Sequence, residues 1–161
     1  MLKRDTSLTE SFRGAWDGLA AAYRKEPNLR FHVAAAWLAL GMAWLAPLSI
    51  LEWVCLIILI GVVVFAELVN TAMERLGDQG ARGEPSLLVG EAKQVAAGAV
   101  LVTALAAVAA GLLLFAPKLS SVVERLEFLA ATNPVAVGGY LLVLGVLGWG
   151  ALVGRRSRGE R

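Results

Sequence analysis

Long apolar stretches separated by short polar segments dominate the chain. Four of these stretches come near the roughly 20 residues that a helix needs to cross the hydrocarbon core of a bilayer. Proline 47 lies near the end of the first stretch, where a helix is expected to stop and turn tightly into the next. The four predicted spans are Phe31 to Leu51, Trp53 to Met73, Val95 to Ala116 and Val135 to Val153. This pattern predicts an all-α integral membrane helical bundle.

Residues 1–30 have a different pattern, because charged residues occur throughout and apolar residues return at helical spacing. Ser7 and Glu10 stand at the offset of a capping box, which predicts a helix start. The apolar positions that follow are Leu8, Phe12, Trp16, Leu19 and Tyr23. Such a segment is typical of an amphipathic helix on the membrane surface, and its lack of an apolar core argues against a signal peptide.

Composition agrees with a membrane protein and narrows its chemistry. Of the 161 residues, 58% are hydrophobic, and the mean hydropathy of +0.67 is too high for an ordinary soluble domain. The single Cys55 excludes a disulfide within the chain, and one cysteine with one histidine argues against a His/Cys zinc site. The net charge of +2 is too small to indicate a nucleic-acid partner.

The positions of the basic residues predict the orientation in the membrane. Lysines and arginines gather before the first span, after the second and after the fourth, and none lies between the first two spans. Cytoplasmic segments carry an excess of such residues. We therefore expect both termini and the loop after the second span on the cytoplasmic side of a bacterial inner membrane, and residues 118–134 outside.

The second span ends in an unusual polar face. Glu67, Asn70, Glu74 and Asp78 fall within roughly 80° of one another at about 100° per residue. Solvated charges at a helix end would explain Asp78 and Glu74, but apolar residues surround Glu67 and Asn70. An ionisable group at this depth costs several kcal/mol and indicates a function.

The chemistry of this face suits a magnesium–nucleotide. Mg²⁺ is usually held by one or two carboxylates and by substrate phosphates. Lys93 opens the third span across a short loop from Asp78, and Glu26 and Arg30 precede the first span on the same side. The chain has neither a P-loop nor the protein-kinase motifs.

Three stretches resemble the small prokaryotic lipid kinases, the diacylglycerol kinase and undecaprenol kinase family. They are EPNLRFH at 26–32, AELVNTAMERLGD at 66–78 and EAKQVAAGAVL at 91–101. The resemblance implies a surface helix in residues 1–30, a three-span kinase core in 31–118, and an addition in 119–161 with a linker, a fourth span and a basic tail. It also implies a homotrimer whose shared sites transfer the γ-phosphate of ATP to a lipid hydroxyl with Mg²⁺.

The resemblance further implies a role for individual residues. Glu67 is expected to be the general base, supported by Asn70, and both would contact the lipid alcohol. Glu26 and Glu74 are expected to hold Mg²⁺ and ATP. The remaining nucleotide contacts would be Gly14, Asp78, Lys93 and Gln94, and the remaining lipid contacts Trp16, Gly18 and Arg30.

Two departures from the family pattern keep alternatives open. Gln94 stands where the family usually has Asp, and the fourth span has no counterpart in three-span members. The EPNLRFH stretch favours undecaprenol slightly over diacylglycerol as the acceptor. The alternative function is a non-catalytic membrane protein, either a small cation carrier or a degenerate family member that binds lipid or nucleotide.

Overall fold

The computed structural model describes residues 7–80 and 86–159, and every regular element within these ranges is a helix. The predicted all-α fold is therefore confirmed. In chain order the elements are α1 (Leu8–Lys25), α2 (Pro27–Leu45), α3 (Ile50–Gly80), α4 (Leu87–Phe115), the 3-10 turn η1 (Ala116–Lys118), α5 (Leu119–Thr132) and α6 (Pro134–Gly159).

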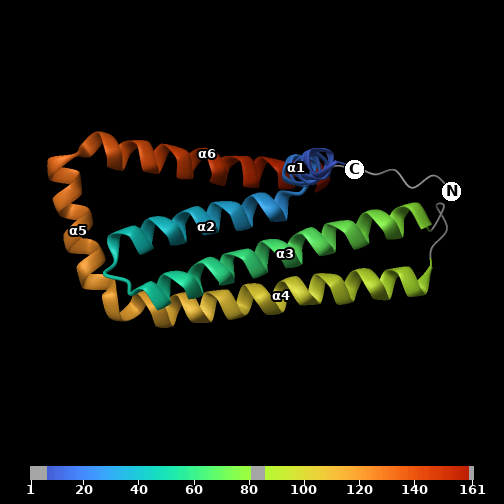
Figure 1. Ribbon diagram of the computed structural model, residues 1–161, viewed down its shortest axis with the longest axis horizontal. Helices are drawn as coiled ribbons and strands as arrows, with labels where there is room; N and C mark the ends of the chain where they lie inside the picture. The colour runs from blue at the N-terminus through green and yellow to red at the C-terminus, as the bar shows by residue number, and fades with distance from the viewer. Residues whose placement is uncertain (1–6, 81–85, 160–161) are drawn as a thin grey trace.

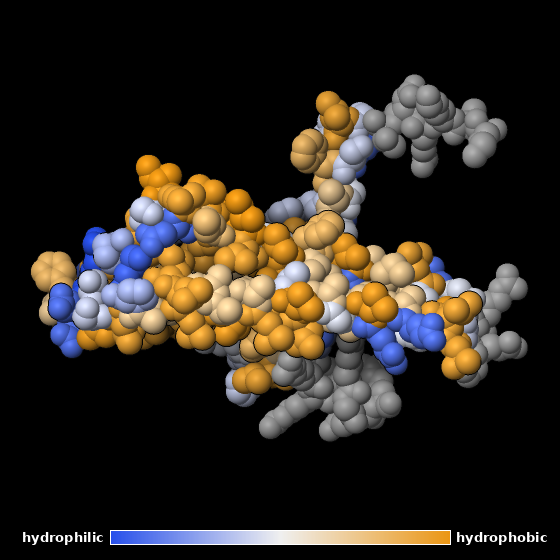
Figure 2. All heavy atoms as spheres, turned by 90° about the horizontal axis from the view of Figure 1, so that it is seen from below, coloured by the Kyte–Doolittle hydropathy of each residue, from blue (hydrophilic) through white to orange (hydrophobic). Residues whose placement is uncertain are grey.

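Helix α1 starts at the capping box expected from the sequence. The Glu10 amide donates to Ser7 Oγ at 3.3 Å, and the Ser7 amide donates to Glu10 Oε2 at 3.2 Å. Its large apolar side chains remain exposed, Phe12 to 76% and Trp16 to 70%. In Figure 2 the helix projects from the bundle with hydrophobic and hydrophilic residues on different sides. This is the form of a helix that lies on a membrane surface.

The joint between α1 and α2 consists of one residue, Glu26. Its backbone is extended, with φ −104° and ψ 109°, and Pro27 follows as the first residue of α2. Proline disfavours a helical conformation in the residue before it but is well tolerated at a helix start. The Glu-Pro pair therefore ends one helix and begins the next, and it fixes Glu26 at the corner.

The boundary of the first predicted span needs correction. Helix α2 ends at Leu45, and α3 begins at Ile50, so a span running to Leu51 would cross the turn. The new helix starts with a second capping box, in which the Ser49 amide donates to Glu52 Oε2 at 2.7 Å and the Glu52 amide to Ser49 Oγ at 3.3 Å. Apolar residues continue across the turn, so hydropathy alone does not mark it.

Within the described residues, three helices are long and apolar enough to cross a membrane. They are α3, α4 with its helical continuation to Thr132, and α6 as far as Val153. Helix α2 is not among them, because it has 19 residues and its first turns include Asn28, Arg30 and His32. With 31 residues, α3 is about 46 Å long. It thus exceeds the roughly 30 Å hydrocarbon core, and its polar end extends beyond it.

The long helices lie side by side in the order α6, α2, α3, α4 (Figure 1). Helix α3 packs mainly against α4, and α2 mainly against α6. A small buried core lies where α2, α3, α4 and α5 meet; its residues are Ala43, Ala46, Leu56, Phe115 and Val122. Most other apolar side chains are exposed, and the face in Figure 2 is largely hydrophobic, as expected for a surface in contact with lipid.

The segment expected to be an outside linker forms α5, which crosses one end of the bundle and connects α4 to α6 (Figure 1). The break before the fourth span lies at Asn133 and Pro134, as the sequence suggests. Helix α6 packs on α2 through Tyr140, whose hydroxyl donates to the Trp37 carbonyl at 2.6 Å. The two aromatic rings also stack, with centroids 5.7 Å apart.

Candidate active site

The polar face predicted on the second span is buried. Only 2% of Glu67 and 5% of Asn70 are exposed, although both lie on a helix whose apolar residues mostly face outward. Thr71 is also on this face and only 4% exposed. The sequence analysis did not assign Thr71, yet its place four residues after Glu67 could have shown that it shares the face. Burial of three neighbouring polar side chains therefore distinguishes this part of α3.

The hydrogen bonds of the face leave two acceptors unused. Asn70 Nδ2 donates to Glu74 Oε1 at 3.1 Å, which fixes the orientation of both side chains. Among the described residues, however, Glu67 Oε2 and Asn70 Oδ1 are buried and have no hydrogen-bond partner. Buried polar atoms almost always have a partner, and these two atoms accept but do not donate. They suit a hydroxyl group or a cation that comes from outside the chain.

Glu26 joins the face from the corner between α1 and α2. It is only 7% exposed, and its Oε1 lies 3.6 Å from Arg75 Nη2 on α3. The ion pair therefore ties the corner between α1 and α2 to α3, the helix that carries Glu67 and Glu74.

The donor set of Glu26 and Glu74 fits Mg²⁺, which prefers carboxylate oxygens. In residues 7–80 and 86–159, no group of three or more His, Cys, Asp or Glu residues forms a ready-made metal cage. An ion at this site would complete its coordination with phosphate oxygens and water, as Mg²⁺ commonly does in nucleotide sites.

Lys93 and Asp78 form an ion pair about two turns beyond the buried face. The lysine reaches Asp78 from α4 by crossing α3 at Gly77. A Cβ atom on Gly77 would come within 2.8 Å of both Lys93 Cε and Val89 Cγ1. The glycine therefore lets α4 approach closely enough for the pair, a role that the sequence analysis missed.

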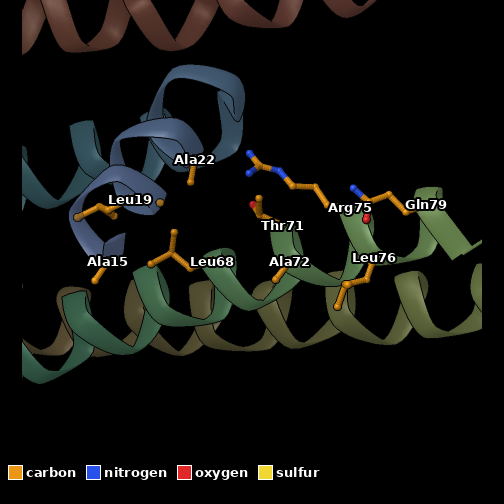
Figure 3. A pocket seen from close by; sticks show the side chains of 10 residues that line it. Ala15, Leu19, Ala22, Leu68, Thr71, Ala72, Arg75, Leu76 and Gln79 are labelled. Atoms are coloured by element: carbon orange, nitrogen blue, oxygen red, sulfur yellow. The ribbon is translucent and has the colours of Figure 1, made fainter. Parts of the chain in front are cut away.

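The other predicted residues lie around this centre. Arg30 is partly buried, and its Nε has no hydrogen-bond partner in the part of the chain that the structure describes. Gly18 lines a pocket of about 570 Å³ between α1 and α3, together with Thr71 and Arg75 (Figure 3). Gly14 and Trp16 are exposed on α1, and Gln94 is exposed on α4.

Comparison with known proteins shows to which family the chain belongs. The family model for prokaryotic diacylglycerol kinase matches residues 13–115. The chain belongs to this family. The match covers most of α1 and all of α2, α3 and α4, so it contains every residue of the candidate site and ends before α5 and α6.

Two relatives support the family assignment. The chain is 41% identical to an undecaprenol kinase of Bacillus subtilis over 113 residues, which cover 70% of this chain and 88% of the relative. It is 36% identical to a diacylglycerol kinase of Synechocystis over 115 residues, which cover 71% of this chain and 66% of the relative. No solved structure matches the chain significantly. With its three candidate spans, the protein is a multi-pass membrane member of this lipid kinase family.

Proposed function

We propose that the protein transfers the γ-phosphate of ATP to the hydroxyl of a membrane lipid alcohol, with undecaprenol as the preferred acceptor. The observation that carries this proposal is Glu67 Oε2, a buried acceptor without a donor at the polar end of a membrane helix. A lipid hydroxyl is a donor that arrives at this depth while its hydrocarbon chain stays in the bilayer.

Glu67 acts as the general base in this proposal. The lipid oxygen forms a bond to the γ-phosphorus, the bond from that phosphorus to the bridging oxygen breaks, and ADP leaves. The hydroxyl proton passes to the Glu67 carboxylate. Asn70 holds Glu74 in place through its 3.1 Å hydrogen bond. Catalysis of this kind depends mainly on positioning and on neutralisation of charge.

Glu26 and Glu74 hold the nucleotide from two directions, one at the α1–α2 corner and the other on α3. The Mg²⁺ that they would bind with ATP neutralises charge on the phosphates when present. Lys93 supplies a cation from α4 and contacts the polyphosphate. The ion pair with Asp78 keeps Lys93 at this end of α3.

The preference for undecaprenol rests on two supports, the EPNLRFH stretch and the greater identity to the Bacillus undecaprenol kinase than to the Synechocystis diacylglycerol kinase. We further propose a homotrimer with shared sites, on the basis of the family resemblance. The trimer is tested by native mass spectrometry of the protein released from detergent micelles.

The proposed setting is the bacterial inner membrane, with both termini in the cytoplasm. The start of α1, the end of α6 and the polar end of α3 lie at the same end of the bundle (Figure 1), which suits the distribution of basic residues. Reporter fusions after Ser120 and after the last residue test this orientation. We expect an outside signal from the first fusion and an inside signal from the second; the reverse result would contradict it.

The activity itself is tested with the purified full chain in detergent micelles. The protein is incubated with labelled ATP and Mg²⁺ and with either undecaprenol or diacylglycerol, and the extracted lipids are scored for labelled phosphate. We expect product from both lipids and faster turnover of undecaprenol. If diacylglycerol is the faster substrate, the acceptor preference is wrong. If a folded preparation phosphorylates no lipid alcohol, the non-catalytic alternative replaces the proposal.

A further inference from the structure

Arg75 is a residue of the site region that neither the motif pattern nor the proposed mechanism uses. It follows Glu74 on α3 and forms an ion pair with Glu26, in which Nη2 and Oε1 are 3.6 Å apart. That distance is too long for a good hydrogen bond. Nη2 is nevertheless buried and has no hydrogen-bond partner among the described residues. The side chain as a whole is 42% exposed, so the guanidinium also faces open space in which an oxygen ligand from outside the chain could bind.

The surroundings of Arg75 leave room for such a ligand. Its side chain projects from α3 toward Ala22 of α1 and lines the pocket of about 570 Å³ between the two helices (Figure 3). The wall on α1 consists of small or apolar residues such as Ala15 and Gly18. The pocket is many times larger than the roughly 30 Å³ that a water molecule occupies in the liquid. A guanidinium group in an open pocket with mostly apolar walls favours an anionic ligand.

The position of Arg75 around α3 complements that of Lys93. At about 100° per residue, Arg75 lies roughly 80° from Glu67 on the side that faces α1. Gly77, over which Lys93 crosses, lies roughly 80° from Glu67 on the other side. One cation therefore stands on each side of the carboxylate face, and each is paired with a carboxylate, Arg75 with Glu26 and Lys93 with Asp78.

We propose that Arg75 binds a phosphate oxygen during the reaction, as the second phosphate-binding cation of the site opposite Lys93. A guanidinium group donates two parallel hydrogen bonds to a phosphate, which gives Arg75 both affinity and orientation. The phosphate has two sources, the γ-phosphate of the nucleotide and the phosphate newly joined to the lipid. This inference rests on the proposed function.

The test compares two substitutions at this position with a matched control in the full-length protein. Arg75→Gln removes the charge, and Arg75→Lys keeps the charge but not the fork of donors. Arg24→Gln removes the same charge from an exposed position near the end of α1. For each variant we would measure kcat and KM for ATP, the affinity for a non-hydrolysable ATP analogue, and the affinity for undecaprenyl phosphate.

We expect Arg75→Gln to lower kcat/KM by about 10- to 100-fold, the range for the loss of a hydrogen bond to a charged group. Arg75→Lys should recover part of this loss, and Arg24→Gln should remain close to the wild type. Weaker binding of the ATP analogue would identify the γ-phosphate as the ligand. Weaker binding of undecaprenyl phosphate alone would identify the lipid phosphate.

Two results would overturn the inference without affecting the proposed function. The first is an Arg75→Gln enzyme with wild-type kinetics and wild-type affinity for both ligands. The second is a loss of activity that is fully restored either by excess Mg²⁺ or in the Arg75→Lys variant. In that case Arg75 would only position Glu26. If the wild-type protein makes no phospholipid but binds the ATP analogue and undecaprenyl phosphate through Arg75, only the proposed function is contradicted.

Discussion

Two glutamates of α3, Glu52 near its start and Glu67 just past its midpoint, have different surroundings. Near the start of the helix, Glu52 accepts hydrogen bonds from the Ser49 amide at 2.7 Å and from Ser49 Oγ at 2.9 Å. It also forms an ion pair with Lys118 of η1. Toward the other end, Glu67 is 2% exposed, and its Oε2 has no partner among the described residues.

This difference matches a structural role for Glu52 and the catalytic role proposed for Glu67. The partners of Glu52 come from the chain itself, and they join the start of α3 to the segment after α4, beside the small buried core. Glu67 is more deeply buried and carries the larger desolvation cost, yet no described residue donates a hydrogen bond to Oε2. Such an arrangement fits the proposed function, in which a ligand supplies the missing donor at the polar end of α3.

The largest expected effect on turnover comes from Glu74→Gln. The substitution removes a proposed metal-binding charge and alters the group that accepts from Asn70 Nδ2. We expect no detectable turnover and weaker Mg²⁺-dependent binding of ATP, measured by isothermal titration calorimetry. If the variant needs the same Mg²⁺ concentration as the wild type, Glu74 is not a metal ligand.

Glu67→Gln should lower turnover by a factor of about 10² or more, which is typical of the loss of a general base. Binding of Mg²⁺–ATP should change little, because Glu67 is not a proposed metal ligand. Both quantities are measured in one preparation. Normal turnover, or the loss of nucleotide binding instead of turnover, would show that Glu67 is not the base.

Gly77→Ala should have a smaller effect that is confined to the polar end. The new Cβ would lie 2.8 Å from Lys93 Cε and Val89 Cγ1, so α4 or the lysine must move away. We expect a higher KM for ATP with little change in kcat at saturation. Gly61→Ala is the matched control, since its Cβ would have no neighbour within 4 Å. Equal KM values for the two variants would contradict the role assigned to Gly77.

The smallest effect on turnover is expected from Glu52→Gln, at the other end of the helix. The variant loses the charge of the ion pair with Lys118 while its side chain keeps a hydrogen-bonding amide. We expect a lower midpoint of thermal unfolding in detergent and turnover close to that of the wild type. Lys118→Met should lower the midpoint similarly, and the double variant should show little further loss. A strong loss of turnover in Glu52→Gln would remove the distinction between the two ends.

Several features of the fold and of the site could be predicted from local sequence. The Ser7–Glu10 capping box depends on two residues three positions apart, and the structure confirms it. The face shared by Glu67, Asn70 and Glu74 follows from helical periodicity, and the Asn70–Glu74 hydrogen bond spans one turn. The apolar runs that form α3, α4 and α6 are likewise local, and they meet the length and hydropathy of membrane spans.

Other features could not be predicted fully from local sequence, and each has a physical reason. Pro47 correctly marked the turn after α2, but apolar residues continue across it, so hydropathy placed the end of the first span too late, at Leu51 instead of Leu45. Residues 119–132 carry enough polar side chains to suggest a linker, yet they form α5 because one side of that helix packs on the bundle, where Val122 is buried. The backbone conformation at Gly77 does not require glycine. The residue matters only because α4 approaches so closely that a Cβ atom would meet Lys93 and Val89.

The sequence by itself determined that this is a helical membrane protein with a polar face on one span, because periodicity and hydropathy are properties of neighbouring residues. Only the tertiary structure decided which polar groups are satisfied. Glu26 meets Arg75 across 49 positions of sequence, and Lys118 meets Glu52 across 66. Hydrogen bonding and burial depend on partners brought together by folding, so the difference between the satisfied Glu52 and the incomplete Glu67 exists only in the folded chain.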